Sequence, residues 1–221
     1  MKDNLHLSFL PQKEMFDYVI TLFGLDINLF EALGAVVGII YLLLEYKAHP
    51  WLWFFGLLMP LFYICLFFDQ RLYANAAINV YYVWASVYGI LCWRGILGSR
   101  QKDESPITSM PRSALWPTVG SIAVVTLVLT LVLQWLGESQ AAWLDGFTAA
   151  LNVVGMFMLA RGWYQQWICW IIVEPVMVVM SILTGMYPTA VMYLVYCVIA
   201  VMGYLRWKKE YLANKKTIGN L

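Results

Sequence analysis

The chain of 221 residues is too apolar and too weakly charged to be a water-soluble protein. Hydrophobic residues make up 62% of it and charged residues 12%, whereas soluble domains carry about 25% charged residues. A fold of this size could not bury so much apolar surface, so lipid must be its solvent. The net charge of +1 argues against a nucleic acid as partner. We therefore expect an all-α integral membrane protein.

The first 27 residues contain no stretch long enough to cross a bilayer. Acidic residues interrupt this segment, and the basic region and apolar core of a cleavable signal peptide are missing. We expect residues 1–27 to form an extracytoplasmic or interfacial segment. Within it, Met15 to Leu25 is predicted to be a helix that lies in the membrane interface.

Seven apolar runs follow, each near the length of about 20 residues that a membrane-spanning helix needs. They cover residues 28–46, 51–68, 72–93, 115–136, 142–160, 163–183 and 187–207. A hydrophilic stretch over residues 94–112 separates the third run from the fourth. The predicted layout is therefore three spans, one connecting span, and three more.

The distribution of basic residues predicts the orientation of these spans. Eleven of the fourteen lysines and arginines lie after the odd-numbered spans or in the C-terminal tail. Short loops rich in basic residues stay in the cytoplasm. We expect the N-terminus outside and the C-terminus in the cytoplasm of a bacterial cell, with the chain spanning its inner membrane.

The third span recurs in the seventh at a distance of 114 residues. Identical residues stand at Tyr73 and Tyr187, Ala76 and Ala190, Tyr82 and Tyr196, Val87 and Val201, Gly89 and Gly203, Leu91 and Leu205, and Trp93 and Trp207. Coincidence between two apolar helices is the alternative explanation. A repeat predicts two parallel three-helix units, because the single connecting span returns the chain to its starting side. Small transporters of the SWEET type are built in this way and bind substrate between the repeats.

This layout predicts five parts of the chain. They are the N-terminal segment 1–27, the first three-helix repeat 28–94, the cytoplasmic linker and connecting helix 95–141, the second repeat 142–207, and a cytoplasmic tail 208–221.

Among the carboxylates inside predicted spans, three are candidate functional groups, because a charged group there is costly and usually functional. Glu31 and Asp145 lie near the outer ends of their spans, so a structural role suits them equally well. Glu174 lies in the middle of its span, next to Pro175, and no lysine or arginine shares that span. We expect Glu174 to contact a ligand; a protonated side chain bonded to a neighbouring helix is the alternative.

Trp167 and Trp170 share a helical stripe with Glu174 because the three residues stand at i, i+3 and i+7. Two indole faces and a carboxylate suit a flat, cationic, heteroaromatic ligand. A tryptophan belt at the membrane interface is the alternative. Further candidate contacts, each of which could instead pack between helices, are Asn75, Asn79, Asn152, Tyr41, Tyr82 and Tyr196.

Neither catalysis nor a resident cofactor is expected. The chain has no phosphate-binding glycine loop, no HExxH and no group of cysteines at metal-ligand spacing. A membrane enzyme would need reactive side chains gathered at one depth. A structural membrane subunit would not need an unpaired carboxylate beneath two tryptophans. Both remain alternatives to a transporter.

The run from Trp167 to Glu174 resembles the WxxWxxxN signature of the Pnu vitamin transporters, with Glu174 in place of the asparagine. Short motifs in the same order include Phe30-Glu31-Ala32-Leu33-Gly34, Phe55-Gly56-Leu57-Leu58, Leu72-Tyr73-Ala74, Tyr88-Gly89 and Gly203-Tyr204-Leu205-Arg206-Trp207, and the resemblance covers about residues 28–209. It implies a homotrimer of SWEET-like subunits and facilitated diffusion of a vitamin precursor. It also implies trapping by a cytoplasmic kinase and a stacking role for Trp167 and Trp170.

The glutamate departs from the nicotinamide riboside carriers of this family, which are called PnuC. Members of the PnuT type carry thiamine, whose aminopyrimidine pairs with a carboxyl group and whose thiazolium is a cation. We therefore expect thiamine as substrate, with nicotinamide riboside as the alternative.

Overall fold

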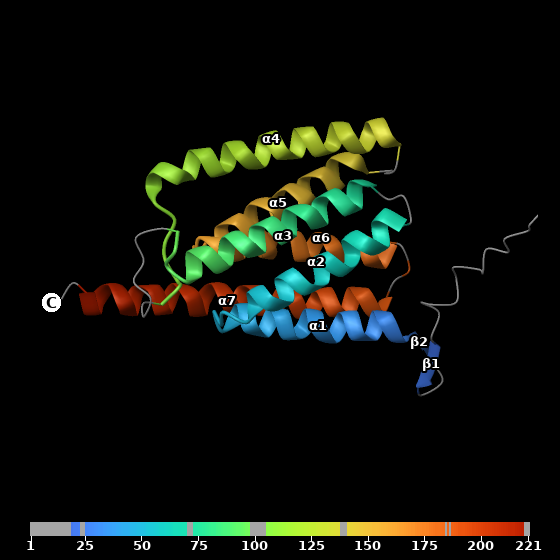
Figure 1. Cartoon of the computed structure of the whole chain (residues 1–221), viewed down its shortest axis with the longest axis horizontal. Coiled ribbons are helices and arrows are strands. Elements are labelled where there is room, and N and C mark those ends of the chain that lie inside the picture. The colour runs from blue at the N-terminus through green and yellow to red at the C-terminus, as the bar shows by residue number, and fades with distance from the viewer. Residues whose placement is uncertain are drawn as a thin grey trace, which may run out of the picture. The chain divides into compact units, whose positions relative to one another are not determined.

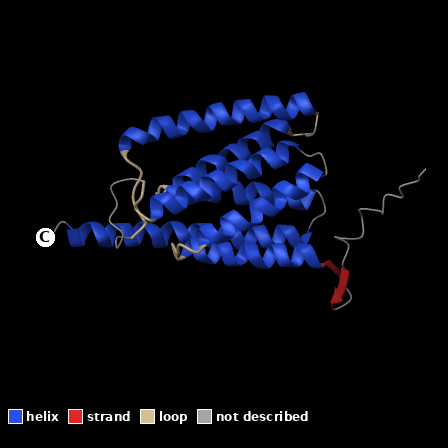
Figure 2. Cartoon of the chain, viewed as in Figure 1, coloured by secondary structure: helices blue, strands red, loops and turns tan. Residues whose placement is uncertain are grey.

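A short β-hairpin and seven helices make up the part of the chain that the computed structural model describes, which covers residues 19–22, 25–69, 73–97, 105–137, 141–183, 185 and 187–218 (Figure 2). The elements are β1 (Val19–Leu22), β2 (Leu25–Asn28), α1 (Leu29–Tyr46), α2 (Leu52–Asp69), α3 (Tyr73–Trp93), α4 (Arg112–Leu136), α5 (Ala142–Ala160), α6 (Gln166–Leu183) and α7 (Tyr187–Ile218). They fall into two units, Met1–Leu43 and Leu44–Leu221, each of which is described by itself.

The hairpin replaces part of the interfacial helix that we expected over Met15 to Leu25. Strands β1 and β2 pair antiparallel, with Val19 opposite Asn28 and Leu22 opposite Leu25. Val19 and Ile20 are β-branched, and such side chains favour strands over helices. The helix prediction is therefore wrong for 19–22, and its first residues lie outside the described part.

The helix bounds agree closely with the seven predicted spans. Helices α3 to α7 are each long and apolar enough to cross a membrane, and α1 and α2 contribute shorter apolar segments. The chain is therefore an all-α membrane protein, as predicted. One boundary differs: α7 continues through the predicted tail as far as Ile218, because no glycine or proline occurs between Arg206 and that residue. The predicted division into five parts remains a prediction.

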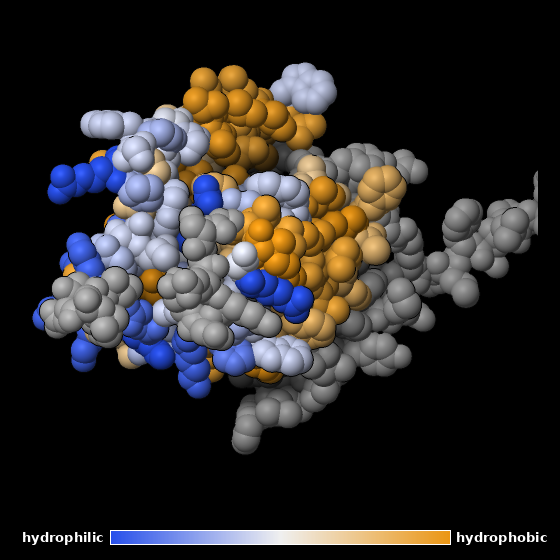
Figure 3. All heavy atoms as spheres, turned by 60° about the vertical axis from the view of Figure 1, so that its left-hand side comes forward, coloured by the Kyte–Doolittle hydropathy of each residue, from blue (hydrophilic) through white to orange (hydrophobic). Residues whose placement is uncertain are grey.

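Within Leu44–Leu221 the helices pack in pairs. Helix α2 lies on α3 and α6 lies on α7, while α5 contacts α3, α4 and α6 (Figure 1). No residue of α4 is buried, and Figure 3 shows hydrophobic side chains gathered at the top and on one side of the view. An apolar surface of this kind is stable only in contact with lipid or another protein chain.

The loops before α2 and α6 repeat one backbone conformation at the predicted distance of 114 residues. Ala48 and Gly162 both have positive φ, 52° and 71°. The amide of Ala48 donates to the Glu45 carbonyl at 2.9 Å, and the amide of Gly162 donates to the Leu159 carbonyl at 2.8 Å. The next bonds match as well, because Leu52 donates to His49 and Gln166 donates to Trp163, both at 3.0 Å. The two loops are therefore copies of one structure.

The core of each helix pair repeats in the same way. Trp53 meets Trp93 edge-on at 5.4 Å between ring centroids, and Trp167 meets Trp207 edge-on at 5.8 Å. Gly89 lies against the Trp53 ring and Gly203 against the Trp167 ring, with no space for a Cβ atom. The sequence repeat predicted the two glycines and the two partner tryptophans at 93 and 207. It did not predict that Trp53 and Trp167 occupy equivalent positions in the two repeats.

Residues 105–111 belong to the predicted cytoplasmic linker and lie directly before α4. We call this segment the strap, because hydrogen bonds attach it to the loop before α6. The amide of Thr108 donates to the Gly162 carbonyl at 2.7 Å, and the amide of Tyr164 donates to the Thr108 carbonyl at 3.0 Å. The Gln165 side chain accepts from the Met110 amide and donates to Ser109, both at 3.0 Å. This strap ties the start of α4 to the second repeat.

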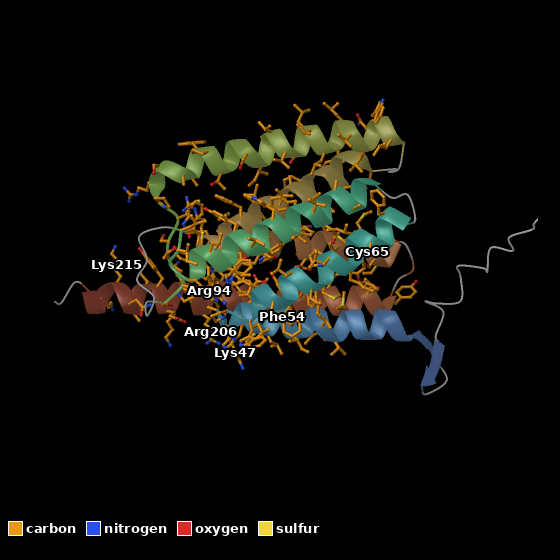
Figure 4. All side chains as sticks on the ribbon, in the orientation of Figure 1. Lys47, Phe54, Cys65, Arg94, Arg206 and Lys215 are labelled. Carbon is orange, nitrogen blue, oxygen red and sulfur yellow. The ribbon has the colours of Figure 1, made fainter. Side chains whose placement is uncertain are left out.

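Basic side chains gather at one end of this unit. Lys47, Arg94 and Arg206 lie together near the loop before α2, and Lys215 extends further in the same direction on α7, whereas Cys65 lies toward the opposite end (Figure 4). Such a gathering is typical of a cytoplasmic end, and the orientation remains a prediction.

Candidate functional site

The first turns of α6 carry the polar and aromatic side chains of the candidate site. Gln166, Trp170 and Glu174 stand four residues apart, so they share one face of the helix. Gln166 is fully buried, and Trp170 and Glu174 are half-buried. Pro175 lies inside the helix directly after Glu174.

The indole of Trp170 is fixed by two acceptors. Its Nε1 donates to Oε1 of Glu45 at 3.0 Å and also contacts Oε1 of Gln166. Glu45 stands in the last turn of α1 and is only 2% exposed. The ring of Trp170 is thereby held beside the carboxyl group of Glu45.

Glu174 extends this polar face one turn further along α6. Its Oε2 is buried and has no hydrogen-bond partner among the described residues. Its carboxyl interacts electrostatically with Glu45 and with Tyr193 and Tyr196 of α7. The arrangement can bind a molecule that brings a hydrogen-bond donor or a positive charge to Glu174.

The structure gives Trp167 a packing role. It is fully buried, lies against Gly203 and Trp207, and is the counterpart of Trp53 in the first repeat. Its Nε1 has no partner within the described residues. Stacking of a ligand on Trp167, as predicted, would require this packing to open, and that role remains a prediction.

The other predicted contacts lie in several places. Tyr196 lies near Glu174, Tyr82 packs edge-on against Tyr81, Asn79 is buried and has an interaction partner, and Asn152 is half-buried on α5. Tyr41 belongs to the first unit, so its position relative to α6 is not described. The side chain of Asn75 lies outside the described residues. The structure thus brings Trp170, Glu174 and Tyr196 together, and the ligand contacts of all these residues remain predictions.

Two residues of the site were missed. Glu45 and Gln166 hold Trp170 in place, yet neither was among the predicted contacts. Glu45 could have been found, because it is an acidic residue inside a predicted span, in Leu42-Leu43-Leu44-Glu45. Gln166 gave no such signal, since it stands near the predicted start of a span, where a polar residue is ordinary.

A groove of about 650 Å³ lies elsewhere, between α3, α4 and α5. Its lining is largely apolar and includes Trp84, Pro117 and Phe157. None of the predicted site residues lines it. Among the described residues, no three side chains of His, Cys, Asp or Glu gather to hold a metal ion.

The sequence comparison decides the family. The model of the family described as nicotinamide mononucleotide transporter matches residues 28–209. The chain belongs to this family. The match covers every predicted span, so the PnuC-like resemblance is confirmed at the level of the family, and a transporter is favoured over a membrane enzyme or a structural subunit.

Curated relatives of this transporter family differ in the solute that they are named for. The nicotinamide riboside transporter PnuC of Escherichia coli strain K12 is 24% identical over 213 residues, which cover 83% of this chain and 87% of the relative. The riboflavin/roseoflavin transporter RibM of Streptomyces davaonensis is 22% identical over 182 residues, covering 80% and 83%.

A solved structure supports the fold. The crystal structure of the vitamin B3 transporter PnuC aligns with a TM-score of 0.62 at 23% identity and covers 82% of this chain and 81% of that one. The fold of this chain is therefore that of a known membrane transporter.

Proposed function

We propose that this protein carries a flat, positively charged vitamin across the membrane, with nicotinamide riboside as the first candidate. The observation that supports this most directly is the half-buried Trp170, held by Glu45 at 3.0 Å with the unpaired carboxyl oxygen of Glu174 one turn away. An indole face binds an aromatic cation through stacking and cation–π attraction, and a carboxylate supplies the opposite charge.

Nicotinamide riboside satisfies these requirements. Its pyridinium ring is a permanent cation, and its carboxamide carries a donor for Glu174. The glutamate in place of the family's asparagine was expected to disfavour nicotinamide riboside. Because its carboxyl group can accept from the carboxamide and attract the pyridinium, Glu174 is compatible with this substrate. The E. coli relative is named for nicotinamide riboside and the Streptomyces davaonensis relative for riboflavin and roseoflavin. Because neither is named for thiamine, nicotinamide riboside precedes thiamine as a candidate.

Thiamine is the second candidate, and Glu174 favours it specifically. A carboxyl group can pair with a ring nitrogen and the adjacent amine of the aminopyrimidine, which an asparagine cannot do in the same way. Riboflavin is neutral, so it gives the two carboxyl groups of the site no counter-charge.

The remaining expectations belong to the same proposal. The protein would work by facilitated diffusion, with two parallel SWEET-like repeats rocking about the site, and a cytoplasmic kinase would trap the product. It would be a homotrimer in the bacterial inner membrane, with the N-terminus outside and the C-terminus in the cytoplasm. The repeated loops and tryptophan–glycine contacts of α2–α3 and α6–α7 support the repeat architecture.

The test is a titration of the purified protein with nicotinamide riboside, thiamine and riboflavin, read by tryptophan fluorescence, together with uptake into proteoliposomes without an energy source. We expect one of the two cations to quench the fluorescence saturably and to be taken up, and riboflavin to do neither. Saturable binding of riboflavin alone would contradict the proposal, as would the absence of binding by either cation.

A further inference from the structure

Two carboxyl groups of the site, those of Glu45 and Glu174, interact electrostatically. Glu45 is 2% exposed, and the charged group that acts on it is Glu174. Helices α1 and α6 contain no lysine or arginine. Arg206 of α7 lies over the ring of Tyr46, 4.6 Å from its centroid. A buried and a half-buried carboxyl group therefore interact where α1 and α6 bring no positive charge.

The internal repeat shows that the fold itself does not require these polar groups. At a distance of 114 residues, Glu45 corresponds to Leu159, and Gln166 corresponds to Leu52. Both leucines are fully buried, so the same two positions are filled by apolar side chains in the other half of the molecule.

The same holds further along α6. Trp170 corresponds to Gly56 and Glu174 to Pro60, and both counterparts are buried. The polar cluster of Glu45, Gln166, Trp170 and Glu174 thus occurs in one half only. A buried carboxylate is costly unless it is paired, so its presence where a leucine would fit points to a task other than packing.

We propose that Glu45 is a specificity-determining residue, which together with Glu174 makes this site select positively charged ring ligands over neutral ones of the same shape. This inference rests on the proposed function and adds to it a residue and a basis for selectivity. Glu45 reaches the ligand through space and through Trp170, whose ring it holds by the indole N–H.

The physical basis is the low dielectric of the buried site. A charge acts much more strongly there than in water, so a carboxylate at the N–H edge of the Trp170 ring attracts a cation lying on that ring. A neutral ring gains the stacking but not this attraction. The second carboxyl group at Glu174 adds to the attraction from the adjacent turn.

The experiment compares two cations with two neutral molecules. Nicotinamide riboside is paired with its 1,4-dihydro form, which has nearly the same shape and no charge. Thiamine and riboflavin, which differ in shape, are measured as the second cation and the second neutral molecule. Affinities are measured by tryptophan quenching for the wild type, for Glu45→Gln and for Glu45→Leu. The glutamine keeps an acceptor for the Trp170 N–H and loses the charge. The leucine is the residue found at the corresponding position of the other repeat.

For the wild type we expect the better cation to bind at least about 10-fold more tightly than its neutral counterpart. Glu45→Gln is expected to lose most of this preference, while its affinity for the neutral molecule changes less than about 3-fold. Glu45→Leu is expected to lose the preference and also to shift the fluorescence of the unliganded protein, because Trp170 loses its fixed acceptor. Glu210→Gln, which removes a carboxylate from the far end of α7, is expected to leave the preference intact.

The outcomes separate the two proposals. If neither cation binds the wild type, the proposed function fails and this inference fails with it. If the wild type prefers a cation and Glu45→Gln keeps that preference in full, the proposed function stands and Glu45 only positions the ring. A wild type that binds the dihydro form as tightly as nicotinamide riboside would also overturn the inference.

Discussion

Glu174 stands where a charged residue is most costly and has no partner within the described part of the chain for its Oε2 atom. We expect Glu174→Ala to weaken binding of the cationic vitamin strongly. A charge-assisted hydrogen bond contributes about 1.5–3 kcal/mol, which corresponds to roughly a 10- to 150-fold loss of affinity. Fluorescence titration measures this loss. Glu210→Gln serves as the control for a change in net charge, and unchanged affinity of the alanine variant would remove Glu174 from the site.

Gly203 lies against the ring of Trp167 and leaves no room for a side chain. A Cβ atom at this position would lie 2.6 Å from the Trp167 ring, so Gly203→Ala forces either the ring or the helix to move. Overpacking of this kind costs about 1–3 kcal/mol, and we expect a lower thermal unfolding midpoint in detergent.

The matched control for this change is Gly120→Ala on α4, where nothing lies within 4 Å of the added atom. Its midpoint is expected to stay the same or to rise slightly, because alanine favours a helix over glycine. Equal midpoints for the two variants would mean that α6 and α7 are not packed as closely as the structure shows.

At the scale of the elements, the strap of residues 105–111 fixes the loop before α6 through the side chain of Gln165. We expect Gln165→Ala to release the Met110 amide, which then exchanges its hydrogen faster with solvent, since its acceptor is lost. Hydrogen exchange followed by mass spectrometry measures this. Gln134→Ala, which changes an exposed amide near the end of α4, is the control, and equal exchange in both variants would show that the strap does not depend on Gln165.

At the scale of the whole molecule, the basic end of the unit Leu44–Leu221 predicts the orientation in the membrane. We expect Lys215→Cys, in a background in which Cys65, Cys92, Cys169 and Cys197 are replaced, to react with a membrane-impermeant maleimide only after the cells are permeabilised. Trp135→Cys, at the opposite end of α4 and 85% exposed before substitution, should react in intact cells. We expect this pattern because cytoplasmic loops hold the excess of basic residues. The reverse pattern would mean that the predicted topology is inverted.

The sequence by itself determined the features that depend on local periodicity and composition. Apolar runs of the length of a bilayer predicted seven helices, because each such run must satisfy its backbone hydrogen bonds within a helix. The recurrence of Gly89 and Trp93 at Gly203 and Trp207 predicted a repeat, and the matching loops at Ala48 and Gly162 agree with it. The carboxyl of Glu174 was recognised because a charge in the middle of an apolar run is conspicuous without any structure.

Only the tertiary structure decided which side chains meet. Trp167 and Trp170 look alike in the sequence, but the first fills the space that Gly203 leaves, and the second turns its N–H to Glu45, 125 residues earlier. The hairpin at Val19 likewise depends on pairing between two segments, which a short stretch of sequence does not reveal. Contacts between distant residues arise from how helices pack, and packing depends on the shapes of both partners together.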